Sequence, residues 1–154
     1  MKKNRIYLLD DDDLIVDMLG RALKDDGYDV HVEKDPTGTI EKVMAFAPDV
    51  IMLDINLPHG VNGVDLLGEL KAAGTLADVI MLTADESAET AVRAMKNGAA
   101  DYLTKPFNLD EVKLVIRRTL DARRMHHEID YLRKTVSEGV ERTIVGDSAP
   151  ITAL

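Results

Sequence analysis

Residues 50–55 read Val-Ile-Met-Leu-Asp-Ile, an apolar run interrupted only by Asp54. An apolar run of this length, without the alternation of a half-exposed strand, is typical of a strand buried on both faces. Strands of this kind belong to parallel sheets whose two faces are covered by helices. The run therefore predicts a central strand, and the rest of the chain must supply its neighbours and its helical cover.

Strand-length segments alternate with helix-period segments on both sides of this run. Four further strands are predicted at residues 6–9, 28–32, 79–82 and 102–104. Helical spacing of apolar residues occurs in residues 14–23, 40–47, 64–70 and 87–97, and a fifth helix begins after Asn108. Five strand–helix repeats predict an α/β fold with a five-stranded, parallel, doubly wound sheet, because a closed eight-stranded barrel needs roughly 250 residues.

The composition narrows the function classes. The 154 residues suit one domain with an appendage, and the absence of cysteine excludes disulfides, thiolate metal sites and cysteine nucleophiles. A net charge of -9 argues against direct DNA binding, because phosphate neutralisation needs clustered Lys and Arg. The first apolar stretch stops at Asp10, which is too short for a signal peptide or a membrane span. We therefore expect a cytoplasmic protein without membrane contact.

Polar residues follow four of the predicted strands, at the edge where ligands bind in open parallel sheets. They are carboxylates after the first and third strands, a hydroxyl after the fourth and an ammonium after the fifth: the run Asp10–Asp13, Asp54, Thr83 and Lys105. An acidic run after a strand often only caps the next helix, and Asp12 or Asp13 is expected to do so. Four such signals at the matching ends of four strands favour a shared site.

The chemistry of such a site is coherent. Clustered carboxylates repel one another and call for a cation, and hard oxygen ligands favour Mg²⁺ (or Mn²⁺) over zinc. A carboxylate can attack phosphorus to give an acyl phosphate, while a metal ion and a lysine offset charge on the transferring group. The residues therefore predict phosphoryl chemistry at this edge.

The chain resembles response-regulator receiver (CheY-like) domains over roughly residues 4–121. The resemblance is carried, in order, by Ile6–Asp11 (IYLLDD), Asp54–Pro58 (DINLP), Val79–Ala84 (VIMLTA) and Asp101–Phe107 (DYLTKPF). It implies a flavodoxin-like sheet of strand order 2-1-3-4-5 with an extended C-terminal helix. One departure is visible, since the loop His59–Gly63 is one residue longer than the turn common in this family.

The resemblance also implies a role for each residue of the constellation. Asp54 is the phosphoryl acceptor, Asp11 a direct Mg²⁺ ligand, and Asp10 an assistant to the metal. The backbone carbonyl of Asn56 completes the protein ligands. Thr83 is the switch hydroxyl, Tyr102 the switch aromatic and Lys105 the phosphate partner, with a cis Lys105–Pro106 bond. A sensor histidine kinase is the implied partner, and the chain is implied to be a regulatory phosphoacceptor rather than an enzyme.

The fourth predicted helix carries small residues on its expected inner face, which buries little area: Ala88, Ala91, Val92, Ala94 and Met95. One interpretation is a movable helix, so that phosphorylation draws in Thr83, admits Tyr102 and changes the face formed by the fourth helix, fifth strand and fifth helix. The alternative is ordinary tight packing of helix on sheet.

The tail predicts more than a receiver domain. Asn108 and Glu111 fit a capping box, and no helix breaker follows until Gly139. Heptad-core positions, with Arg118 as an exception, are occupied by Val115, Ala122, Met125, Ile129, Leu132 and Val136. They predict a homodimer through a coiled-coil linker helix at 122–139, assisted by the face of the fourth helix, fifth strand and fifth helix. A single amphipathic helix that packs on another domain is the alternative.

Residues 144–154 resemble the opening of the AAA+ ATPase domain in NtrC-type, sigma-54-dependent activators. We therefore predict a receiver domain at 1–121, the linker at 122–139, and the start of an ATPase domain at 140–154 whose remainder is absent from this chain. No Gly-rich phosphate loop is present. The alternatives are a single-domain or phosphorelay receiver, a constitutive dimerisation module, or a haloacid-dehalogenase-type phosphotransferase. Asn56 stands where such an enzyme needs a second acid.

Overall fold

The computed structural model describes residues 3–84 and 87–146, with side chains described up to residue 126 and at 129 and 132. The chain divides into two compact units, Met1–Leu120 and Asp121–Leu154. Strands and helices alternate as expected: β1 Arg5–Leu9, α1 Asp13–Asp25, β2 Asp29–Glu33, α2 Thr39–Phe46, β3 Val50–Asp54, η1 Pro58–Gly60, α3 Gly63–Ala72, β4 Asp78–Thr83, α4 Ala88–Lys96, β5 Asp101–Thr104 and α5 Leu109–Gly146.

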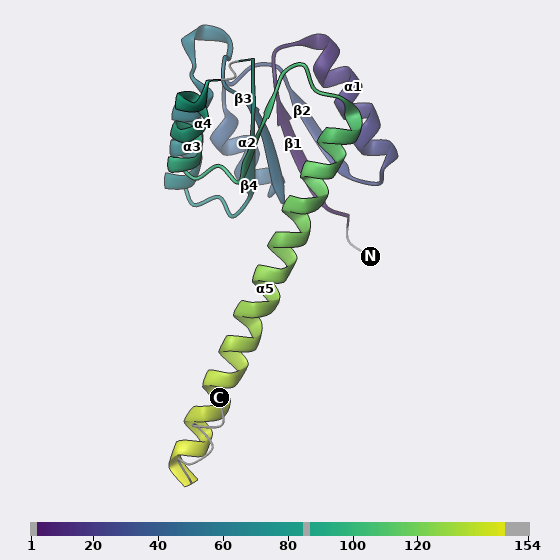
Figure 1. Cartoon of the computed structure of the whole chain (residues 1–154). Helices are drawn as coiled ribbons and strands as arrows, with labels where there is room; N and C mark the ends of the chain where they lie inside the picture. Colours follow the sequence, from purple (N-terminus) through teal and green to yellow (C-terminus); the bar gives the residue numbers. More distant parts are fainter. Residues whose placement is uncertain (1–2, 85–86, 147–154) are drawn as a thin grey trace. The chain divides into compact units, whose positions relative to one another are not determined.

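The five strands form one parallel sheet in the order β2-β1-β3-β4-β5, which confirms the predicted fold. All five residues of β3 are buried, as its unbroken apolar run predicts, whereas β2 at the edge is half-exposed. Helices α1 and the first part of α5 cover one face, and α2, α3 and α4 cover the other (Figure 1). The core is therefore two apolar layers, one on each face of the sheet.

Strand register brings the predicted site residues to one level. Leu9 pairs with Leu53, so Asp10 and Asp54 stand side by side at the ends of neighbouring strands. Thr83 pairs with Thr104, which places Thr83 beside Lys105, the residue that follows β5. Parallel strand pairing alone therefore brings these predicted site residues to the same edge of the sheet.

Helix α4 packs differently from the prediction. Of its expected inner face only Ala94 is buried, while Val92 and Met95 are about half exposed. A single small side chain suffices against the sheet because it lets the helix backbone approach closely. The larger apolar residues then face outward. The helix is consequently held by very little buried area.

The fifth helix is longer than predicted. It starts after Asn108, whose Oδ1 accepts a hydrogen bond from Glu111 N at 2.7 Å, but it continues through Gly139 to Gly146. The expected end at Gly139 is wrong, because one glycine costs a helix only about 1 kcal/mol when the residues around it favour helix. Residues 147–154, on which part of the ATPase-domain prediction falls, lie outside the described residues.

Val115 also departs from its expected place. It is buried in the core of the first unit with Ile116 and Val112, so it is not available to a dimer seam. Among the side chains described beyond it, the exposed apolar ones include Ala122, Met125, Ile129 and Leu132. Val136 lies outside the residues whose side chains are described. No helix in the described part of the chain is both long and apolar enough to cross a bilayer.

Candidate phosphorylation site

Three carboxylates meet at the carboxyl edge of the sheet. Asp10 follows β1, Asp54 ends β3, and one oxygen from each of Asp10, Asp11 and Asp54 lies within 4.8 Å of the others. Asp10 is fully buried and Asp54 is 4% exposed, whereas Asp11 is exposed. The cluster therefore combines two buried carboxylates with one that is exposed to solvent.

The four consecutive acids after β1 have separate structural roles. Asp12 caps α1, since its Oδ1 accepts hydrogen bonds from Leu14 N at 2.9 Å and Ile15 N at 3.4 Å. The backbone N–H of Asp12 in turn donates to Asp10 Oδ1 at 2.9 Å. The expected helix cap is therefore Asp12, and it also fixes the orientation of the Asp10 carboxylate.

Lys105 joins the two buried carboxylates. Its Nζ lies 2.8 Å from Asp10 Oδ2 and 3.4 Å from Asp54 Oδ2. The lysine is directed there by the strand end, because its backbone N–H donates to Thr83 O at 2.6 Å and the following Lys105–Pro106 bond is cis, as expected. Thr83 is buried at the end of β4, and Tyr102 on β5 is 39% exposed.

The pKa values reflect this crowding. Burial, followed by the negative charge of Asp10, raises the pKa of Asp54 to about 6, with Lys105 acting in the opposite direction. Burial alone would lower the pKa of Lys105, but hydrogen bonding and charge attraction to Asp10 and Asp54 outweigh it and raise that pKa. One ammonium thus stabilises carboxylates that would otherwise repel one another.

The donor set fits a hard divalent cation. Three carboxylates face one ammonium, which leaves an excess of negative charge when all are ionised. Asp10 Oδ2 is buried and, apart from its ion pair with Lys105, accepts no hydrogen bond from the described residues. Carboxylate oxygens with neither His nor Cys among them are the ligands that Mg²⁺ prefers. The residues can therefore hold such an ion.

The loop after β3 is closed by a glycine whose role the sequence analysis missed. Gly63 N donates to Ile55 O at 2.6 Å, and Asn56 pairs with Asn62 as an isolated bridge. A Cβ on Gly63 would overlap the carbonyl oxygen of Asp54 and lie 2.8 Å from Ile55 Cα. The only signal in the sequence was an Asn-Gly pair before a helix, which also suits an ordinary helix start.

Asn56, whose backbone carbonyl is a predicted metal ligand, is an exposed residue two positions after the end of β3, and its backbone N donates to Asp54 Oδ1 at 3.3 Å. At the tip of this loop, His59 and Gly60 both adopt left-handed backbone conformations, with φ of 63° and 71°. The base of the loop, and the residues next to Asp54, are therefore held in a closed turn.

The family model for the response regulator receiver domain matches residues 6–117. The chain belongs to this family. It is 36% identical over 134 residues to the Regulatory protein AtoC of Escherichia coli (strain K12), covering 87% of this chain and 29% of that protein. It is 30% identical over 148 residues to the DNA-binding transcriptional regulator NtrC of the same strain, covering 96% of this chain and 31% of that protein.

Among solved structures, NtrX from Brucella abortus is similar to this receiver with a TM-score of 0.79 and 31% identity, over 86% of this chain and 31% of that one. The receiver chain thus spans about a third of the length of these relatives. Receiver domains are regulatory phosphoacceptors of two-component systems, and this chain is a receiver related to NtrC-type regulators.

Proposed function

We propose that Asp54 accepts a phosphoryl group from a sensor histidine kinase, or from a small acyl phosphate, in a reaction that depends on Mg²⁺ (or Mn²⁺). The observation that carries this proposal is the convergence of Asp10, Asp11 and Asp54 within 4.8 Å, with Lys105 against two of them. Asp11, Asp10, Asp54 and the backbone carbonyl of Asn56 are the proposed metal ligands. We assign no enzymatic activity on outside substrates.

Each side chain has a defined part in the transfer. An oxygen of the Asp54 carboxylate forms a bond to phosphorus while the bond from phosphorus to the donor breaks and its electron pair leaves with the donor. Lys105 Nζ, already 3.4 Å from Asp54 Oδ2, stabilises negative charge on the transferred oxygens. The Thr83 hydroxyl donates to one of these oxygens. A bound divalent cation supplies further neutralisation of the phosphoryl charge.

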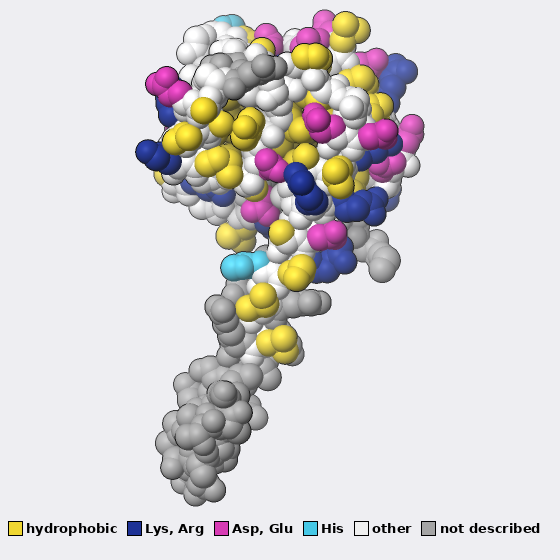
Figure 2. Space-filling model, viewed as in Figure 1, with side chains coloured by type: hydrophobic (Ala, Val, Ile, Leu, Met, Phe, Trp, Pro, Cys, Tyr) yellow, Lys and Arg dark blue, Asp and Glu magenta, His cyan; other side chains and the backbone are white. Residues whose placement is uncertain are grey.

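The same proposal extends to the output of the receiver. Helix α4 is weakly packed, and apolar side chains are exposed on it and on neighbouring elements: Val92, Met95, Tyr102 and Leu114. An open groove of about 590 Å³ runs between β5 and the start of α5. Figure 2 shows hydrophobic side chains on this side of the molecule among charged ones. We propose that phosphorylation moves Thr83 and Tyr102 and so alters this face.

Dimerisation is the proposed readout. Met125, Ile129 and Leu132 recur at helical spacing and are exposed, as the seam residues of a coiled coil are in a single chain. In this proposal the seam and the α4–β5–α5 face form a homodimer whose geometry depends on phosphorylation. By likeness to NtrC, which is named as a DNA-binding transcriptional regulator, the receiver is proposed to control a sigma-54-dependent activator in the cytoplasm.

A phosphate-affinity gel tests the acceptor directly. Incubation with acetyl phosphate and Mg²⁺ is expected to give one slow band, which EDTA and Asp54→Asn abolish. Asp65→Asn is the matched control, since Asp65 is an exposed acid in the first turn of α3 and away from the cluster. A slow band that persists in Asp54→Asn, or no band in the wild type, contradicts the proposal. Sedimentation with and without beryllofluoride tests the dimer.

A further inference from the structure

Three consecutive residues at the end of β2 are tied to both loops that carry the proposed metal ligands. Glu33 O accepts a hydrogen bond from Asp10 N at 3.1 Å, and Lys34 forms an ion pair with Asp13. Asp35 Oδ2 lies 2.9 Å from His59 Nε2 in the loop after β3. The segment 33–35, which we call the rim segment, therefore connects the Asp10 loop with the Asp54 loop without belonging to either.

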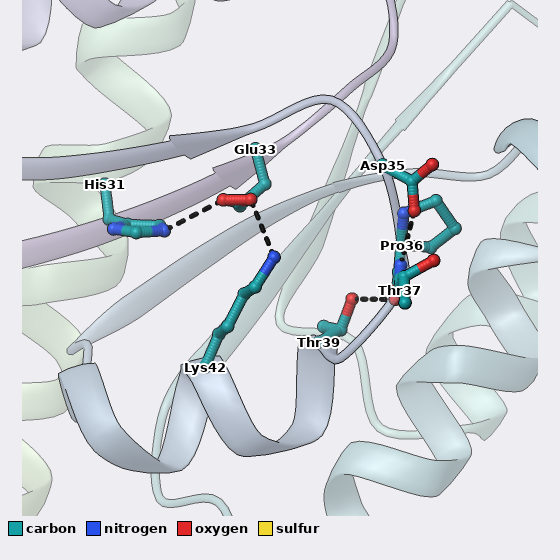
Figure 3. Close-up of polar contacts among 7 residues, drawn as sticks. All are labelled: His31, Glu33, Asp35, Pro36, Thr37, Thr39 and Lys42. Carbon is teal, nitrogen blue, oxygen red and sulfur yellow. Dashed lines mark hydrogen bonds and ion pairs between the residues drawn. The ribbon is translucent and has the colours of Figure 1, made fainter.

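The rim segment is itself held firmly (Figure 3). The Glu33 carboxylate bonds Lys42 Nζ at 2.9 Å and His31 Nε2 at 3.2 Å. On the other side of the segment, Thr39 Oγ1 donates to Pro36 O at 2.6 Å. These contacts anchor the segment to helix α2 and the sheet edge. It can therefore act as a fixed support against which the site loops are held.

The Asp35 carboxylate is oriented by a hydrogen bond within its own loop, independently of its contact with His59. Its Oδ1 accepts a hydrogen bond from Thr37 N at 2.8 Å, which fixes the carboxylate in the loop (Figure 3). Hydrogen bonds from Thr37, and then from His59, lower the pKa of Asp35 to about 2. The group is therefore an oriented carboxylate throughout the physiological pH range.

His59 adopts a backbone conformation that a non-glycine residue rarely takes. Its φ is 63°, and residues held in such conformations cost about 1–3 kcal/mol and persist only where surrounding contacts impose them. The base of its loop is closed by backbone hydrogen bonds from Leu57 to Val61 and from Gly63 to Ile55. At the tip, the contact with Asp35 reaches another loop. The left-handed backbone at the loop tip thus presents His59 to the rim segment.

We propose that Asp35 and His59 are positioning residues for the metal site, a role that rests on the proposed function. Carboxylates without a cation repel one another, which favours separation of the loops that carry them. The Asp35–His59 contact opposes this separation and orders the loop that carries Asn56 before the metal arrives. Because the loop is already ordered in the metal-free protein, its conformational entropy is not lost when Mg²⁺ binds, so Mg²⁺ binds more tightly.

The expected change in Mg²⁺ affinity follows from the solvent exposure of the Asp35–His59 pair. The side chains of His59 and Asp35 are 67% and 49% exposed, and exposed pairs of this kind change an equilibrium by roughly two- to fivefold. Mg²⁺ alone is the probe, and its dissociation constant is measured by calorimetry or by amide shifts. His59→Gly is preferred to alanine because glycine accepts the left-handed backbone without strain. Asp35→Ala and the double variant complete a cycle.

The expected result is a two- to fivefold weaker Mg²⁺ affinity in each single variant, with the double variant no weaker than the worse single. Long-range charge alone predicts the opposite for His59→Gly, because removal of an imidazole near a cation site leaves affinity unchanged or strengthens it. Asp17→Ala is the matched control, since the Asp17–Arg21 pair is similarly exposed on α1 but touches neither site loop. Melting temperatures are expected to stay within a few degrees of the wild type.

Three outcomes overturn the positioning role: unchanged affinity in His59→Gly, multiplicative effects in the double variant, or an equal loss in Asp17→Ala. If the wild type is phosphorylated on Asp54 and the Asp35 and His59 variants bind Mg²⁺ as tightly as the wild type, the positioning role is overturned but the proposed function stands. A wild type that binds no Mg²⁺ overturns both the inference and the metal dependence of the proposed function.

Discussion

Gly63→Ala offers the sharpest single test of how the loop after β3 holds Asp54, the proposed acceptor. The new Cβ would overlap Asp54 O and lie 2.8 Å from Ile55 Cα and 2.9 Å from Asp54 C. All three atoms belong to the backbone and cannot rotate away, so the turn itself must shift. Overpacking of this kind costs roughly 1–3 kcal/mol, against which the better helix propensity of alanine returns about 1 kcal/mol at most.

The matched control lies in the same helix. Gly68 is half-buried in the interior of α3, and a Cβ there would meet nothing closer than Asn97 Oδ1 at 4.0 Å. Gly68→Ala is therefore expected to stabilise the protein by roughly 0.5–1 kcal/mol through helix propensity. Both variants replace a glycine of α3 by alanine, so stability changes of opposite sign would isolate the clash with the backbone of Asp54 and Ile55.

The assay is urea unfolding followed by far-ultraviolet circular dichroism, because the chain contains no tryptophan. Gly63→Ala is expected to unfold at lower urea than the wild type and Gly68→Ala at higher urea. Since the displaced backbone belongs to Asp54, Gly63→Ala should also weaken Mg²⁺ binding, whereas Gly68→Ala should not. Equal or greater stability of Gly63→Ala would refute the reasoning.

Three further predictions concern charge and association. Without metal, the pKa of Asp54 is raised to about 6 from an ordinary 3.8, so its ionised form opposes folding above pH 6, and Asp54→Asn should be more stable than the wild type by up to about 3 kcal/mol at pH 8. This stability difference should shrink as pH falls through 6 towards 4, and Mg²⁺ should reduce it. A stability difference that does not change with pH in urea titrations would count against this prediction. Lys105→Ala should slow phosphorylation by acetyl phosphate on the order of a hundredfold in gel time courses, while Lys113→Ala on α5 should not; equal rates would remove Lys105 from the transfer. Ile129→Glu should shift sedimentation from dimer to monomer, with Arg124→Glu on the same helix as the control, and a surviving dimer would exclude the seam.

The positions of the proposed site residues could be predicted from the sequence because parallel pairing leaves little freedom. Asp10 and Asp54 follow strands that pair directly, so their neighbourhood depends only on strand order and register. The cap at Asn108 was equally predictable, since it depends on local backbone geometry. Features that rest on one strand end or one helix turn are thus open to sequence reasoning.

Features that depend on tertiary packing were not predictable in this way. The sequence alone does not distinguish Ala94, which faces the sheet, from Met95, which does not, because both are apolar and the contact depends on how α4 docks on the sheet. The role of Gly63 depends on a strand nine residues earlier, and the contact between Asp35 and His59 depends on two loops meeting. Helix α5 passed Gly139 because the flanking residues outweigh one unfavourable position.

The most direct test of the acceptor assignment is chemical mapping of the modified residue. After incubation with acetyl phosphate and Mg²⁺, borohydride reduction converts an aspartyl phosphate to homoserine, and peptide mass spectrometry locates it. The predicted result is homoserine at position 54 in wild-type peptides, with none when EDTA replaces Mg²⁺. Homoserine at Asp10 or Asp11 instead, or an unmodified position 54 in a chain that demonstrably binds Mg²⁺, would contradict the central claim.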